Sequence, residues 1–144
     1  MLARRPLAAV LAAGASLAAG CGAEAGSGAA SKSFPDPERQ AVSAAVRDLS
    51  DAARQGDYEQ ICADYLAAPL VKQFDEEKGT ARCPDEIELS LRDVTENELA
   101  VRDVRISGPD AVAVVLPAGT GEQGDSARLT FVKEGTRWKL SGVQ

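Results

Sequence analysis

The amino-acid sequence predicts an α+β domain in which three N-terminal helices precede an antiparallel sheet. Between residues 37 and 94 the apolar side chains recur every three or four positions, which is typical of amphipathic helices. After Thr95 the period changes to two, and turn sequences separate consecutive apolar runs. Helices that come first and strands that follow as sequence neighbours indicate an α+β domain with mostly consecutive antiparallel strands.

The first helix is predicted from its two ends. Asp36 is a good N-cap, and Pro37 suits the first helical position. Gly56 is a typical stop signal at the other end. The helix between them is expected to bury Val42, Ala45, Val46, Leu49 and Ala53.

Two further helices are predicted in the first half of the domain. Asp57 and Gln60 form a capping pair for the second helix, which Pro69 breaks or restarts. Pro84 opens the third helix. The side chains expected on the inner faces are Ile61, Cys62, Tyr65, Leu66, Leu70, Val71 and Phe74, and then Ile87, Leu91 and Val94.

The strands are predicted from alternation and from turn residues. Val104 and Ile106 alternate with Arg105 in the first strand. The run 111–116 has almost no polar residue, which predicts a strand that is covered on both faces or lies at the centre of the sheet. The inward residues of the last two strands are expected to be Leu129, Phe131, Trp138 and Leu140.

The first 21 residues have the layout of an export signal. Arg4 and Arg5 precede an apolar run from Leu7 to Ala19, and Cys21 follows closely. This order resembles the lipobox of bacterial lipoproteins, in which the cysteine becomes the first mature residue and its thiol is diacylated. The apolar run holds about 13 residues, fewer than the roughly 20 that a membrane-spanning helix needs. A plain signal peptide cut at an Ala-x-Ala site is the alternative.

These features divide the chain into three parts. Residues 1–20 are predicted to be a lipoprotein signal peptide, residues 21–35 a lipidated N-terminus and flexible tether, and residues 36–144 a single α+β domain. The tether is predicted from its small, polar and glycine-rich composition. We therefore expect the domain on the extracytoplasmic face of the cell membrane, anchored by lipid on Cys21.

The charge balance excludes several classes of partner. The chain has a net charge of −6, and removal of residues 1–20 with their two arginines leaves 14 basic and 22 acidic residues, a net charge of about −8. Such a negative charge argues against binding to nucleic acid and against peripheral binding to anionic lipid. The chain has no histidine, the commonest metal ligand and general acid or base. We expect no metal, no cofactor and no nucleic-acid partner.

Cys62 and Cys83 remain once Cys21 is acylated. Two thiols in an exported chain most often pair, and closing this loop of 21 residues should contribute about 3 kcal/mol. A metal or redox site is the alternative, but two cysteines without histidine cannot complete a tetrahedral zinc shell, and the spacing is not Cys-x-x-Cys. The sequence therefore predicts a structural disulfide.

Two short segments carry a family resemblance: 54–58 between the first two helices and 136–140 on the last strand. With the order of elements, they resemble the NTF2-like (SnoaL-like) superfamily, and more closely the small secreted lipoproteins of that type in high-GC bacteria. The likeness covers about residues 37–143 and implies a curved antiparallel sheet wrapped by three helices, a cone with a pocket inside. The strand that usually follows the second helix is not found, and the loop 117–126 is extended.

A pocket inside the cone would be lined by Tyr65, Phe74, Phe131 and Trp138 and would suit a small apolar ligand. The alternative is that these side chains simply fill the core. A third hypothesis is a module that binds an envelope protein through the exposed sheet face or the acidic helix ends.

The resemblance also raises an enzyme of the isomerase or dehydratase type with a small apolar substrate. Asp64 beside Tyr65 is the nearest pair of acid and hydroxyl, but a solvated Asp64 and a core Tyr65 explain the pattern more simply. No catalytic residue is therefore predicted. We expect a non-catalytic module for a small apolar ligand or an envelope protein.

Overall fold

The computed structural model describes residues 31–77, 82–94, 98–118 and 125–144. The described residues form an α+β domain with a four-stranded antiparallel sheet, which confirms the predicted class. The helical elements are α1 (Pro37–Gln55), α2 (Tyr58–Gln60), the single π-helical turn η1 (Ile61–Tyr65), α3 (Ala68–Glu77) and α4 (Cys83–Leu91). The strands are β1 (Leu99–Ser107), β2 (Asp110–Pro117), β3 (Ala127–Glu134) and β4 (Arg137–Val143).

The predicted number of three helices is wrong, because the second predicted helix is divided. At Leu66 the backbone leaves η1 and becomes extended, with φ −94° and ψ 141°. The next residue, Ala67, donates its N–H to the carbonyl of Leu140 at 2.8 Å, and Leu66 forms an isolated parallel bridge with Leu140. This contact with β4 replaces helical hydrogen bonds, and α3 starts afresh at Ala68 with Pro69 in its first turn.

The predicted ends of α1 are confirmed. The carboxylate of Asp36 accepts a hydrogen bond from the N–H of Arg39 at 3.0 Å, and Pro37 occupies the first turn. At the other end Gly56 adopts a left-handed conformation with φ 71°, which a side chain would strain. These local interactions set where the longest helix begins and ends.

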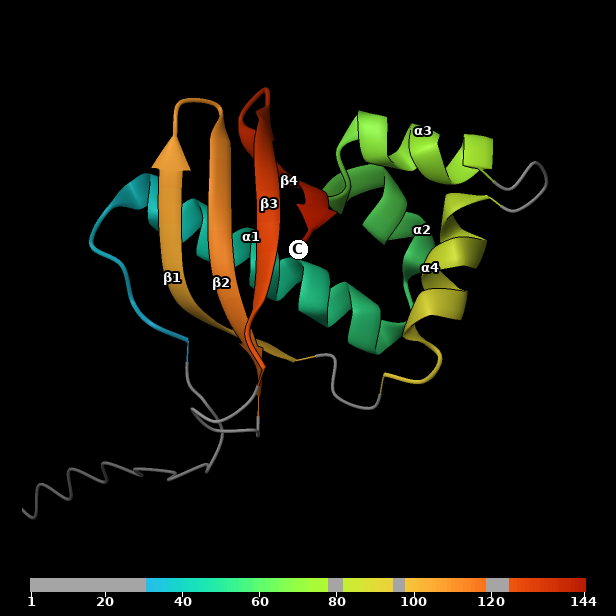
Figure 1. Ribbon diagram of the computed structural model, residues 1–144, viewed down its shortest axis with the longest axis horizontal. Helices are drawn as coiled ribbons and strands as arrows, with labels where there is room; N and C mark the ends of the chain where they lie inside the picture. The colour runs from blue at the N-terminus through green and yellow to red at the C-terminus, as the bar shows by residue number, and fades with distance from the viewer. Residues whose placement is uncertain (1–30, 78–81, 95–97, 119–124) are drawn as a thin grey trace, which may run out of the picture.

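The sheet has the strand order β1-β2-β3-β4, and α1 crosses one of its faces (Figure 1). In β2 the buried residues Ala111, Ala113 and Val115 alternate with the half-buried Val112 and Val114. The strand therefore lies inside the sheet, as predicted, but its outer face is not fully covered. Of the two predicted alternatives, the central position in the sheet is therefore confirmed, and burial on both faces is not.

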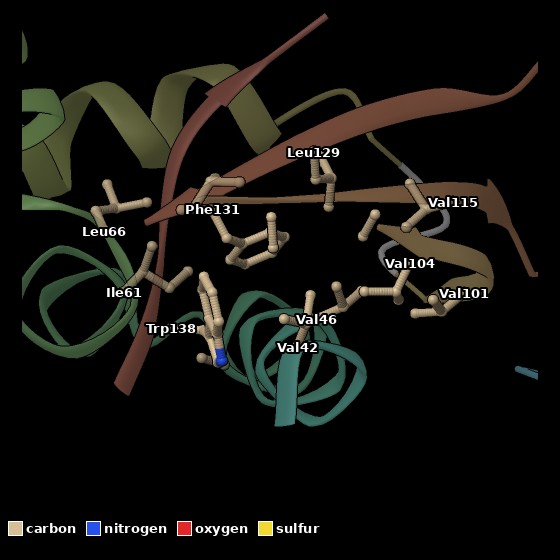
Figure 2. Packing of buried hydrophobic residues seen from close by; sticks show 14 of the residues in the cluster. Val42, Val46, Ile61, Leu66, Val101, Val104, Val115, Leu129, Phe131 and Trp138 are labelled. Atoms are coloured by element: carbon tan, nitrogen blue, oxygen red, sulfur yellow. The ribbon is translucent and has the colours of Figure 1, made fainter. Parts of the chain in front are cut away.

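The space between α1 and the sheet is filled with side chains. Figure 2 shows Val42 and Val46 of α1 against Val104 of β1, with Phe131 and Trp138 beside them. Phe131 is 2% exposed and Trp138 is 5% exposed. The side chains predicted to face inward on the last two strands do so, and they form the main hydrophobic core.

Irregular segments cover both edges of the sheet. The N–H of Lys32 donates to the carbonyl of Val101 on β1 at 2.8 Å, and the hydroxyl of Ser31 accepts from the N–H of Val101 at 3.1 Å. Phe34 is buried beside the N-terminal part of α1, where the Gln40 side chain donates to its carbonyl. The last residues of the predicted tether thus lie against the domain, and Leu66 protects the β4 edge in the same way.

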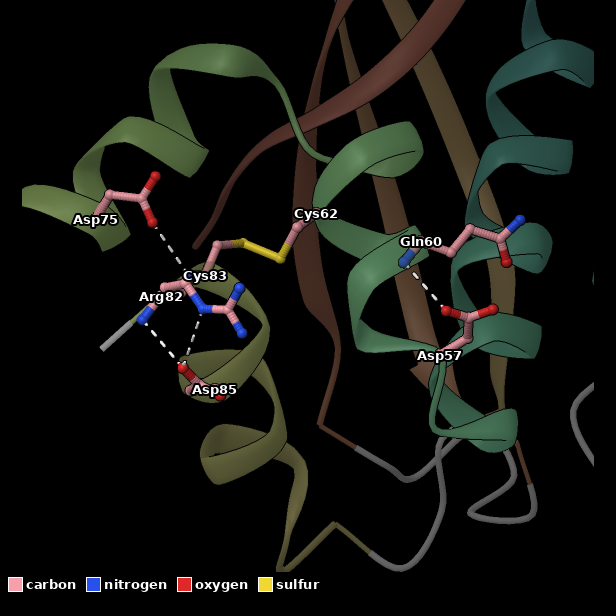
Figure 3. The surroundings of a disulfide bond; sticks show 7 residues. All are labelled: Asp57, Gln60, Cys62, Asp75, Arg82, Cys83 and Asp85. Carbon is pink, nitrogen blue, oxygen red and sulfur yellow. Dashed lines mark hydrogen bonds and ion pairs between the residues drawn. A yellow bond between two sulfur atoms is a disulfide. The ribbon is translucent and has the colours of Figure 1, made fainter. Parts of the chain in front are cut away.

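A disulfide joins Cys62 of η1 to Cys83 of α4 and confirms the predicted pair (Figure 3). The two Cα atoms are 6.2 Å apart. The N–H of Cys83 also donates to the carboxylate of Asp75 on α3 at 3.1 Å. Three helical elements therefore meet at the first turn of α4. The expected burial of Val94 is wrong, since α4 ends at Leu91 and Val94 is 43% exposed.

Candidate functional site

The four residues predicted to line one pocket lie in different surroundings. Tyr65 and Trp138 line an open cleft between α1, η1 and the start of β4. Phe131 lies in the core, and Phe74 packs half-buried against that core from α3. The structure therefore brings Tyr65 and Trp138 together at one cleft and places the two phenylalanines in packing positions.

The cleft beside Tyr65 has a volume of about 440 Å³. Its floor is the face of α1 that carries Ala41, Ala44 and Ala45, which share one side of the helix because of their spacing. Tyr65 of η1 and Trp138 of β4 also line it. We name this space the α1–η1 cleft.

The α1–η1 cleft is lined by two acidic side chains and one basic side chain, and by the uncharged polar residues Gln60 and Thr136. Asp48 of α1 and Asp64 of η1 line it together with Arg137 of β4. The guanidinium of Arg137 lies 3.4 Å from the carboxylate of Asp64 in a solvent-exposed ion pair. Burial raises the pKa of the Tyr65 hydroxyl, and the carboxylates of Asp48 and Asp64 raise it further. Tyr65 is therefore neutral at physiological pH.

Trp138 is held in place at the end of this cleft. Its indole N–H donates to the carboxylate of Glu38 at 3.0 Å, and the ammonium of Lys133 lies 5.6 Å from the centre of its ring. Lys133 also donates to Glu38 at 2.8 Å. These hydrogen bonds, that from Lys133 first and that from Trp138 next, hold the pKa of Glu38 below its usual value.

A second concave surface lies between α1, α4 and the end of β4. Leu49 and Ala53 of α1, Ile87 and Leu91 of α4, and Leu140 of β4 line it, and its volume is about 260 Å³. We name it the apolar groove. The groove could not be recognised from the sequence, because the apolar side chains on the inner faces of both helices were expected to pack in the core. The small side chain of Ala53, among larger apolar residues, was the sequence feature that indicated unfilled space at this end of α1.

The apolar groove offers little chemistry beyond hydrophobic contact. Its lining contains two polar residues, Ser50 and Ser90. The hydroxyl of Ser50 donates to the carbonyl of Val46 at 2.9 Å, one turn earlier in α1. None of the described residues that line the groove has an ionisable side chain. The groove is therefore suited to holding an apolar group.

In residues 31–77, 82–94, 98–118 and 125–144, no three cysteine, aspartate or glutamate side chains lie close enough together to hold a metal ion. No helix in the same ranges has the length and apolar character needed to cross a membrane.

Comparisons with known proteins show a similarity to solved structures. No protein-family model matches the chain. No curated protein matches it. Among solved structures, the chain is similar to the solution structure of a SEC-C motif containing protein from Rhodopseudomonas palustris, with 20% sequence identity and a TM-score of 0.54. The match covers 70% of this chain and 75% of that one. At this level of identity the likeness concerns the fold alone.

Proposed function

We propose that this chain is an exported lipoprotein, anchored through Cys21 to the extracytoplasmic face of the membrane. Its domain is a non-catalytic binding module, and the apolar groove holds one hydrocarbon chain of a membrane lipid. The observation that carries the proposal is the position of this groove, at the end of the sheet from which the predicted tether leaves the domain.

The lining of the groove supports an aliphatic occupant. The rim residues Val94 and Val143 are 43% and 65% exposed, so apolar surface continues from the groove to the solvent. Each methylene group that moves from water into such a site gains about 0.8 kcal/mol. A hydrocarbon chain suits this lining, because its described residues carry no charge that would need a partner.

The tether geometry supports a lipid of the same membrane as the source. Ser31 is hydrogen-bonded to Val101, and Leu99 of the groove lies two residues earlier on β1, about 7 Å along the strand. Ten residue steps separate Cys21 from Ser31 and span at most about 35 Å when fully extended. An acylated Cys21 would keep the groove within this reach of the bilayer.

We also propose that the domain is an NTF2-like fold. Its support is the series of helices followed by an antiparallel sheet, with α1 packed across one face (Figure 1). The bridge between Leu66 and Leu140 lies where that family usually has a further strand, directly after the second predicted helix. A shortened strand would explain why the sequence pattern did not reveal it.

Metabolic labelling with a fatty-acid analogue tests the anchor. The wild-type protein should incorporate the label and remain in the membrane fraction, whereas Cys21→Ala should do neither. Equal labelling of Cys21→Ala would refute lipidation at this residue.

Native mass spectrometry of the detergent-extracted protein tests the groove. The wild-type protein should retain a lipid, and Ala53→Leu should lose it, because the larger side chain occupies the groove. Ala44→Leu is the matched control, since it places the same side chain on the other side of α1. A lipid-free wild-type protein, or Ala53→Leu with unchanged lipid, would refute the proposal.

A further inference from the structure

We infer that the α1–η1 cleft is a separate binding site for a small organic cation with a flat apolar body. The ammonium group would lie beside Asp48 and Asp64, and the apolar body would lie between the alanine face of α1 and Tyr65. The shape of the cleft indicates the flat apolar body of the ligand, and the charge of the cleft indicates its positive charge.

The shape follows from the side chains that α1 presents. Ala41, Ala44 and Ala45 extend no further than Cβ, so the wall formed by α1 is low and smooth. Tyr65 and the edge of the largely buried Trp138 are the aromatic side chains of the lining. The volume of about 440 Å³ lies in the range of small-molecule sites. A ligand with a planar ring would therefore fit between the alanine side chains of α1 and the aromatic side chains of the lining.

The charge follows from the two carboxylates and the single guanidinium. Arg137 is paired with Asp64, whereas the carboxylate of Asp48 makes no hydrogen bond or ion pair with another residue in the described ranges. The lining thus carries an excess of one negative charge. An anionic ligand would meet two carboxylates, while a cation would meet an available carboxylate at Asp48. The acidic balance of the whole domain favours a cation further.

Tyr65 contributes a neutral hydroxyl and an aromatic face. The raised pKa keeps its proton in place, so the hydroxyl can donate to a polar group of the ligand. Its ring can also contact an ammonium group through a cation–π interaction. The face of Trp138 is already approached by Lys133, so we assign this contact to Tyr65.

This site does not depend on the apolar groove. Ala44 and Asp48 lie on the side of α1 that faces the cleft, whereas Leu49 and Ala53 line the groove. A substitution can therefore block one space and leave the other open. The lipid proposal can fail while the cation proposal holds, and the reverse is equally true.

Intrinsic fluorescence gives a direct assay, because Trp138 lines the cleft and is the only tryptophan in the sequence. We would titrate the full chain with phenethylamine, which joins a primary ammonium to a phenyl ring. The neutral analogue 2-phenylethanol is the matched ligand control. Phenethylamine should give a saturable change in Trp138 emission at millimolar concentrations, and 2-phenylethanol should bind at least tenfold more weakly, a difference of about 1.4 kcal/mol.

For three variants the inference predicts whether phenethylamine binding becomes weaker or stronger. Asp48→Asn should weaken phenethylamine binding at least tenfold, and Ala44→Leu should abolish it by filling the cleft. Arg137→Gln should strengthen binding, because it removes a competing cation and frees Asp64. Asp51→Asn is the charge control: Asp51 is also on α1 but pairs with Arg54 and does not line the cleft.

Several results would overturn the inference. One is the absence of saturable binding to the wild-type protein. Another is equal binding of phenethylamine and 2-phenylethanol, which would mean that charge plays no part. Unchanged affinity in Asp48→Asn, or an equal loss in Asp51→Asn, would show that the carboxylates of the cleft do not form the site.

Discussion

Removal of the disulfide should destabilise the domain by about 3 kcal/mol. Cys62 and Cys83 are 21 residues apart, so the chain-entropy relation gives about 11 cal/mol/K, or about 3 kcal/mol at 25 °C, in the unfolded chain. Small domains have total stabilities of only about 5–15 kcal/mol. The loss would therefore be a large part of what holds this domain folded.

Removal of the disulfide should also loosen the structure locally, around α4. The bond ties the first turn of α4 to η1, and without it α4 is held by packing and by the hydrogen bond from the Cys83 N–H to Asp75 (Figure 3). Because Ile87 and Leu91 of α4 form one wall of the apolar groove, the groove should loosen before the sheet unfolds. Lipid retention should then fall at denaturant concentrations that leave Trp138 emission unchanged.

The assay is urea unfolding of the Cys62→Ala/Cys83→Ala double variant, followed by the emission of Trp138. With an m value of about 1.5 kcal/mol/M, a loss of 3 kcal/mol lowers the midpoint by about 2 M. Wild-type protein treated with a reductant is the matched control and should behave as the double variant does. A loss below about 1 kcal/mol, or no effect of reductant, would refute the reasoning. Two free thiols in peptides of the non-reduced exported protein would do so as well.

Two further predictions concern the residues around the α1–η1 cleft and the core. Hydrogen bonds from Lys133 and Trp138 lower the pKa of Glu38 in the folded protein. The ionised carboxylate therefore stabilises the fold at pH values above its ordinary pKa of about 4.3, and this stabilisation is lost as the pH falls through the lower pKa of the folded state. The urea midpoint of Glu38→Gln should therefore fall less between about pH 6 and about pH 3 than that of the wild type, and identical profiles would contradict this role. Phe131→Ala should cost about 3–5 kcal/mol because Phe131 is 2% exposed, whereas Phe74→Ala should cost less because Phe74 is only half-buried; equal losses in urea unfolding would show that burial does not distinguish them.

Features that depend on neighbouring residues were predictable from the sequence. Asp36 and Gly56 mark the ends of α1 because a cap needs only a side chain and the backbone within one turn. The pairing of Cys62 with Cys83 was also predictable, because the predicted export signal would assign Cys21 to a different chemistry and leave two cysteines. The alternation after residue 98 identified the strands because side chains in a strand must alternate between the two faces.

Features that depend on distant residues were decided only by the tertiary structure. Pro69 marks a break or restart of the second predicted helix, but the sequence does not show that Leu66 pairs with β4, because its partner Leu140 lies far along the chain. Tyr65 and Phe131 are both apolar positions with inward periodicity, yet Tyr65 lines a cleft and Phe131 fills the core. Periodicity tells which face of an element is turned inward. How closely another element approaches that face depends on packing across the whole domain, and this distance decides between a filled core and an open site.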